Sequence, residues 1–111
     1  MKKLTFLSLI YFCASIAAFA GSQSGQVKNV IIRASDGLVY VEVTGTAENK
    51  PGCATHSYWM IKDEKSLTGR QQLASLLLAQ ANGQTVSIIG NGSCTRWSDG
   101  EDIDYIIINS K

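Results

Sequence analysis

Histidine and proline are scarce in this sequence of 111 residues, which contains one of each. A single histidine, His56, leaves little material for a hydrolytic triad or a multi-histidine metal site. With 45% apolar residues and ten glycines, the composition does not suggest disorder or a collagen-like repeat. The length fits one compact domain rather than a multidomain enzyme.

Long apolar runs and excess positive charge are also missing after residue 20. No stretch there reaches the roughly 20 apolar residues that span a bilayer. The same part of the chain has eight Lys and Arg against nine Asp and Glu. We therefore expect no membrane span in the mature form and no nucleic-acid partner, because nucleic acids are bound through clustered basic residues.

The first 20 residues have the three parts of a secretory signal. Residues 1–3 are a short basic region, residues 4–17 are an apolar run, and residues 18–20 are a small-x-small cleavage site before Gly21. The alternative is a membrane anchor, but the apolar run is too short for one. We predict a signal peptide over residues 1–20 and a secreted or periplasmic protein.

Cleavage of the leader also removes Cys13, which leaves two cysteines, Cys53 and Cys94. In an oxidising compartment we expect them to form a disulfide that closes a loop of about 40 residues and stabilises the fold by about 4 kcal/mol. The alternative is zinc, because Cys53 and His56 have Cys-x-x-His spacing and Cys94 would add a ligand. A fourth ligand is missing, so we expect no metal and no cofactor.

Apolar alternation predicts five strands, with one helix between the third and the fourth. The strands are expected over residues 27–32, 38–44, 57–61, 85–89 and 103–108. Three sets of side chains are each expected to share one face: Val39, Val41 and Val43; Trp59 and Ile61; and Ile103, Tyr105 and Ile107. An Asp-Gly turn over residues 35–37 makes the first two strands a hairpin. Residues 21–25 have nothing to bury, so a flexible tail is predicted there and the domain is placed at residues 26–111.

The helix is predicted from a capping box and an apolar stripe. Thr68 and Gln71 have the capping-box spacing, and Asn82-Gly83 is typical of a helix end. The stripe expected to face the core consists of Leu73, Leu76, Leu77 and Gln80, widened by Ala74 and Ala81.

The element order, three strands, a helix and two strands, is that of the five-stranded oligonucleotide/oligosaccharide-binding (OB) barrel. In such a barrel an amphipathic helix closes the open end. We therefore predict a mainly β, OB-like barrel with one helix. The alternative is an open α+β sheet with the helix packed across one face.

The helix exit, Asn82-Gly83-Gln84-Thr85-Val86-Ser87-Ile88, resembles the Gly-Gln-x-Val-x-Ile run in the binding subunits of subtilase cytotoxin and pertussis-like toxins. Those subunits are exported, disulfide-bonded and built on this barrel. The resemblance implies a ring-forming, glycan-binding subunit, and it assigns no sugar-contact residue to this chain.

An acidic stretch, Asp99 to Asp104, is the main candidate for other chemistry. A carboxylate pair for glycoside cleavage or a calcium site can be drawn from it. Four acids within six residues are more typical of a solvated, turn-forming cluster, which is our interpretation. With no nucleophile beside His56, we expect no enzyme.

The loop between the last two strands contains the candidate ligand-binding residues Arg96, Trp97 and Asp99. An indole ring stacks on the apolar face of a sugar, and the two charged side chains would bind hydroxyl groups. Alternatively, Trp97 covers the end of the barrel. The leading hypothesis is an exported, non-catalytic, glycan-binding module that forms a ring of identical copies. The alternative is a monomeric structural or inhibitory protein that binds another protein.

Overall fold

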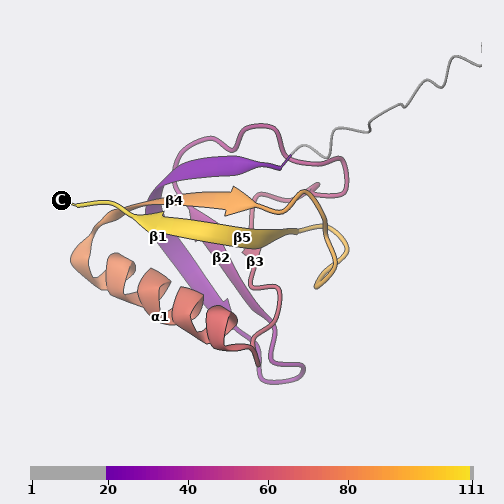
Figure 1. Cartoon of the computed structure of the whole chain (residues 1–111), viewed down its shortest axis with the longest axis horizontal. Coiled ribbons are helices and arrows are strands. Elements are labelled where there is room, and N and C mark those ends of the chain that lie inside the picture. Colours follow the sequence, from indigo (N-terminus) through magenta and orange to yellow (C-terminus); the bar gives the residue numbers. More distant parts are fainter. Residues whose placement is uncertain (1–19, 111) are drawn as a thin grey trace, which may run out of the picture.

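The five strands close into a barrel in the order β1-β2-β3-β5-β4 (Figure 1). The computed structural model describes residues 20–110. Its elements, in chain order, are β1 (Ser22–Ile32), β2 (Val39–Val43), β3 (Trp59–Met60), α1 (Leu67–Asn82), β4 (Thr85–Gly90) and β5 (Glu101–Ile108). The predicted element order and closed barrel are confirmed, and the open sheet is excluded. The predicted leader and Cys13 lie outside the described residues, apart from Ala20.

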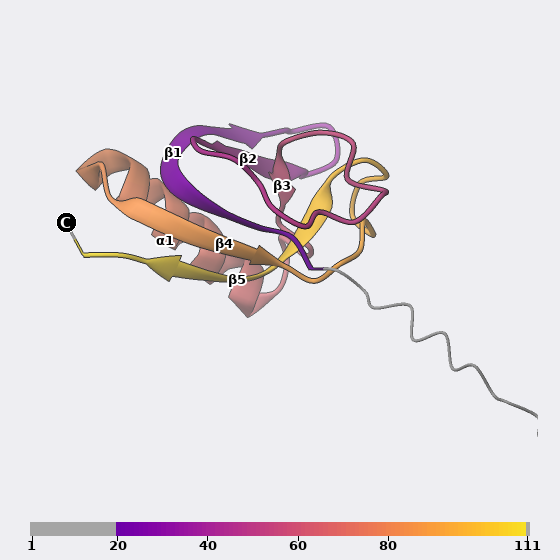
Figure 2. The ribbon, with the colours of Figure 1, turned by 90° about the horizontal axis from the view of Figure 1, so that it is seen from above.

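Strand β1 belongs to both halves of the barrel. Residues 22–26 pair with β4, the later residues pair with β2, and the register shifts between Val27 and Asn29. Figure 2 shows the strand curving between these two partners. A Cβ on Gly25 would overlap the carbonyl of Thr44, so only glycine fits beside that backbone. The predicted flexible tail at residues 21–25 is wrong, because β4 satisfies the backbone of this polar segment, and the domain begins before residue 26.

The barrel is closed by its shortest strand. β3 pairs antiparallel with β2 and parallel with β5. The predicted hairpin of the first two strands is confirmed, with Gly37 in the turn at φ 74°. The strand predicted over residues 57–61 is reduced to two residues, since the charged segment after Ile61 turns away toward the helix.

The core contains the predicted valines of β2 together with Trp59 and Ile61. They pack in one cluster with Val27, Leu76, Ala79, Val86, Ile88 and Ile103. The predicted common face of Ile103, Tyr105 and Ile107 is wrong, since Tyr105 is 50% exposed and Ile107 48% exposed. A register shift opposite Ile89 and Gly90 reverses the alternation, so Ile106 and Ile108 pack against the core instead.

Helix α1 packs against β1, β4 and β5, and buries Leu76 and Ala79. Its N-cap is Ser66, whose side chain accepts a 3.0 Å hydrogen bond from the Gly69 N–H, so the predicted cap at Thr68 is wrong. The predicted C-terminal glycine is correct, with Gly83 at φ 63°. The buried stripe is rotated from the predicted one: Leu77, Gln80, Ala74 and Ala81 are exposed, while Gly69 and Gln72 are buried. Among residues 20–110, no helix is long and apolar enough to cross a membrane.

Candidate functional site

An aromatic patch, consisting of Tyr40, His56, Tyr58 and Trp97, lies where two loops meet β2 and β3. The ring centroids of Tyr40 and Tyr58 are 5.0 Å apart, and the His56 ring stacks on Tyr58 at 5.3 Å with an 8° interplanar angle. A small pocket of about 70 Å³ lies within the patch. Its lining adds Arg33, Leu38 and Met60 to Tyr40, Tyr58 and Trp97.

The predicted disulfide is confirmed and supports this patch. Cys53 and Cys94 are bonded, with their Cα atoms 6.2 Å apart. The bridge joins the loop that carries His56 to the loop that carries Trp97, so the two sides of the patch are held together covalently. The zinc alternative is wrong, because both thiols are consumed by the disulfide.

Asp99 binds two members of the patch. Its carboxylate accepts a hydrogen bond from the hydroxyl of Tyr58, and its Oδ2 lies 3.4 Å from His56 Nε2. Burial, followed by the hydrogen bond to Asp99, raises the pKa of Tyr58 to about 12, although the neighbouring Trp97 acts in the opposite direction. Tyr58 therefore stays protonated at neutral pH and presents its ring and hydroxyl as fixed features.

Trp97 remains partly open to solvent, with 39% of its surface exposed. The guanidinium carbon of Arg33 lies 4.7 Å from the centroid of the indole, which is a cation–π contact. Arg33 is held in turn by Asp36, through hydrogen bonds of 2.9 and 2.6 Å. This bond to Arg33 lowers the pKa of Asp36 well below its usual value. The indole is therefore positioned but not buried.

The side chain of Arg96 binds groups that are not members of the aromatic patch. Its Nε donates to Glu64 at 2.8 Å, and its Nη2 donates to the carbonyl of Asp36 at 3.1 Å. Of the three predicted ligand residues, the structure thus brings Trp97 and Asp99 together and engages Arg96 in holding their loop. The cation beside Trp97 is Arg33.

The sequence does not directly indicate Arg33, Tyr40, His56 and Tyr58 as residues of one binding site, because they lie in three separate segments. One usable signal exists in the strand pattern. Tyr40 alternates with the buried Val39 and Val41, and Tyr58 precedes the buried Trp59. An outward-facing aromatic residue next to a core position on neighbouring strands indicates a surface patch.

Two acids of the predicted solvated cluster are fully buried, so this interpretation is wrong for Glu101 and Asp102. Asp102 accepts backbone N–H groups of Thr95 and Arg96 at 3.0 and 3.2 Å, which shapes the loop just before Trp97. Glu101 accepts from backbone N–H groups elsewhere. The cluster is divided between separate partners, and residues 20–110 contain no group of three or more metal-binding side chains.

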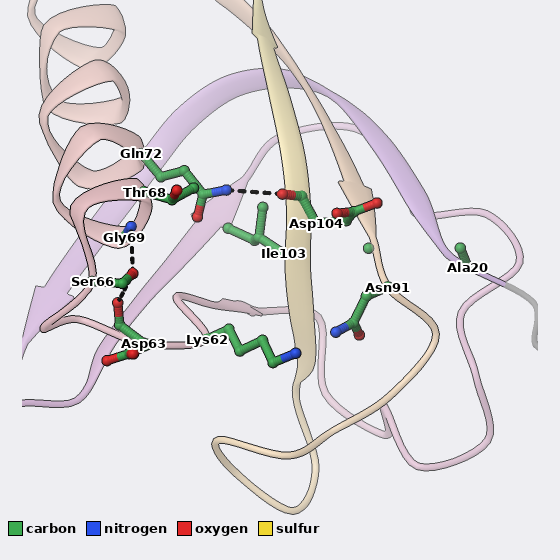
Figure 3. A pocket seen from close by; sticks show the side chains of 11 residues that line it. Ala20, Lys62, Asp63, Ser66, Thr68, Gly69, Gln72, Asn91, Ile103 and Asp104 are labelled. Atoms are coloured by element: carbon green, nitrogen blue, oxygen red, sulfur yellow. Dashed lines mark hydrogen bonds between the residues drawn. The ribbon is translucent and has the colours of Figure 1, made fainter.

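A second cleft of about 400 Å³ lies between the start of α1, the end of β4 and the first half of β5 (Figure 3). Several of its polar groups bind one another. Ser66 donates to the carbonyl of Asp63 at 2.8 Å, and Gln72 donates to the carbonyl of Asp104 at 3.0 Å. Larger volume alone does not make this cleft the better site, since stacked rings are absent from its lining.

Comparison with known proteins found no match to this chain among protein-family models, curated proteins or solved structures. The functional inference therefore rests on the chemistry of the aromatic patch.

Proposed function

We propose that this chain is an exported, non-catalytic binding protein whose aromatic patch binds a glycan. The observation that carries the proposal is the partly exposed indole of Trp97 beside the Tyr58–Asp99 hydrogen bond. An indole face accepts the C–H face of a sugar ring, while the carboxylate and phenol offer hydrogen bonds to hydroxyl groups. Strands β2 and β3 and the β4–β5 loop are also the usual ligand surface of OB barrels.

Binding fits the patch better than catalysis does. His56 and Asp99 form a pair that would suit a general base. The hydroxyl that is hydrogen-bonded to this pair is that of Tyr58, and its raised pKa makes it a poor nucleophile at neutral pH. Packed rings and a short hydrogen-bond network instead make a rigid surface, which keeps the entropy cost of binding low.

A glycan array comparing the wild type with Trp97→Ala tests this function. We expect the wild type to bind a defined glycan class and Trp97→Ala to lose about 5- to 150-fold in affinity, by analogy with the stacking of a nucleic-acid base on an aromatic residue, which is worth roughly 1–3 kcal/mol. Tyr105→Ala is the matched control, because Tyr105 is an exposed aromatic residue on β5 outside the patch. Binding unchanged by Trp97→Ala, or binding to no glycan, would contradict the proposal.

We further propose that copies of the chain associate through the outer face of α1. Leu67 is 71% exposed and Leu78 61% exposed. They lie about three turns apart and therefore on the same side of the helix. Arg70 is the only charged residue in α1, so two such faces meet with little electrostatic repulsion. Two such faces packed on each other close a dimer, whereas the ring expected from the toxin-subunit resemblance requires this face to pack on a different surface of the next copy.

A further inference from the structure

The carboxylate of Glu101 is a deeply buried group that the aromatic patch does not use. Glu101 is 0% exposed, and its Oε2 accepts N–H groups from Gly21 and Gly92, each at 3.0 Å. Its Oε1 is buried and has no hydrogen-bond partner among the described residues. Leaving a buried carboxylate oxygen without a donor costs free energy, so this oxygen points to a missing partner.

Two glycines make the space around this carboxylate. A Cβ on Gly21 would overlap Oε1 of Glu101, and a Cβ on Gly90 would overlap Oε2. The N–H of Gly90 donates to the carbonyl of Gly21 at 2.8 Å, which holds the Gly21 backbone in place. The nitrogen of Gly21 is therefore fixed beside the carboxylate.

The ammonium group of Lys50 is close enough to interact electrostatically with Glu101, but its hydrogen bonds go to other groups. Burial lowers the pKa of Lys50, and the charge of Glu101 opposes this by raising it. Its ammonium lies 4.1 Å from the centroid of the Trp59 ring and donates to the carbonyls of His56 and Tyr58 at 3.2 and 3.3 Å. Among residues 20–110, Lys50 makes no ion pair with Glu101.

We propose that the counter-charge of Glu101 is the α-ammonium of Gly21, formed when the leader is cleaved after Ala20. Ala20 is exposed and Gly21 is buried, so the bond between them lies where the chain enters the barrel. A leader peptidase adds water across this amide: the Ala20 carbonyl becomes a carboxylate and the Gly21 nitrogen becomes an ammonium.

The new ammonium has three N–H donors where the amide has one. One of them retains the hydrogen bond to Oε2 of Glu101, and another donates a hydrogen bond to Oε1, which otherwise has no partner. The buried carboxylate thereby gains both its missing donor and an opposite charge. Cleavage is thus a maturation step that stabilises the barrel, and a chain extended beyond Gly21 lacks this ion pair.

The first test compares two purified chains, one beginning at Gly21 and one extended by Ala20 alone. We expect the extension to raise the equilibrium constant for unfolding by about 10- to 100-fold, the range measured for hydrogen bonds to charged groups. In the Glu101→Gln background the same extension is expected to have little effect. An equal effect in both backgrounds, or no effect in the wild type, would overturn the proposal.

The second test uses the wild-type chain and requires no variant. The full-length chain is expressed, the exported product is recovered, and the N-terminus of that product is determined by mass spectrometry. The folded product is then treated with an amine-acylating reagent. We expect a chain that starts at Gly21 and an α-amine that reacts at least tenfold more slowly than the exposed Lys62 and Lys65. A different first residue, or an α-amine as reactive as these lysines, would overturn the ion pair.

Discussion

The indole N–H of Trp59 donates a 2.8 Å hydrogen bond to the side-chain oxygen of Gln23 inside the barrel. The amide nitrogen of Gln23 donates in turn to the carbonyls of Val43 and Gly45, both at 3.0 Å. This one side chain therefore connects β1, β2 and β3 at their polar atoms. Through these hydrogen bonds, the first half of β1 is tied to the core although its sequence is polar.

Replacing Gln23 with alanine is expected to destabilise the fold by about 2–4 kcal/mol, because it leaves the Trp59 N–H and backbone carbonyls buried without partners. Urea denaturation measures the change. Gln71→Ala, on the exposed side of α1, is the matched control and is expected to stay within about 0.5 kcal/mol of the wild type. If the two variants had equal stability, the Gln23 network would not be a structural element.

Reducing the Cys53–Cys94 bond is expected to cost about 4 kcal/mol by the chain-entropy relation, given a sequence separation of 41. The double variant Cys53→Ser/Cys94→Ser provides the same measurement without reductant. Glycan affinity should fall as well, since the bridge holds the two loops of the aromatic patch together. A stability that did not respond to reductant would show that the bridge adds little to this barrel.

The phenol of Tyr58 is expected to titrate at about pH 12, and Asp99→Asn is expected to lower this pKa toward 10. The pKa is higher in the folded chain than in the unfolded one. The protonated phenol therefore stabilises the fold fully below about pH 10, and this contribution is lost as the pH rises toward 12. NMR of ¹³C-labelled tyrosine resolves the titration, with Tyr58→Phe to assign the signal. Unchanged titration in Asp99→Asn would contradict the role of the carboxylate.

Self-association is expected to depend on the outer face of α1. Native mass spectrometry of the mature chain at micromolar concentration should show a closed oligomer, and the double variant Leu67→Glu/Leu78→Glu should be a monomer. Lys28→Glu, an exposed change on β1, controls for added charge. A monomeric wild type would remove the ring and favour the monomeric, protein-binding alternative.

The fold was largely predictable from the sequence, because valines alternate along the strands and a glycine marks the end of the helix. Residues 22–26 were missed because Gln23 is buried through hydrogen bonds, which hydropathy does not register. Glu101 and Asp102 were missed for the same reason, since hydrogen bonds from backbone N–H groups, which offset part of the cost of burying a carboxylate, are not visible in the sequence. The N-cap was predicted at Thr68 but lies at Ser66. Both residues have a hydroxyl side chain, so only the local backbone geometry distinguishes them.

The candidate site was predictable only in part. Trp97 and Asp99 were found because they lie in one loop beside a cysteine. Their partners Tyr40 and Tyr58 come from other segments, and only the pairing of β2 with β3 brings these rings together. Arg33, for which no role was predicted, lies beside Trp97 where Arg96 was expected, because the position of each arginine depends on which carboxylate or carbonyl lies within reach.

The most direct measurement of the glycan-binding claim is an NMR titration that follows the indole N–H signals of the two tryptophans. Trp59 is fully buried and Trp97 is 39% exposed, so the chain contains its own internal control. With the best glycan from the array, we predict a saturable shift of the Trp97 signal and an unmoved Trp59 signal. A bound glycan that leaves the Trp97 signal unchanged would contradict the account.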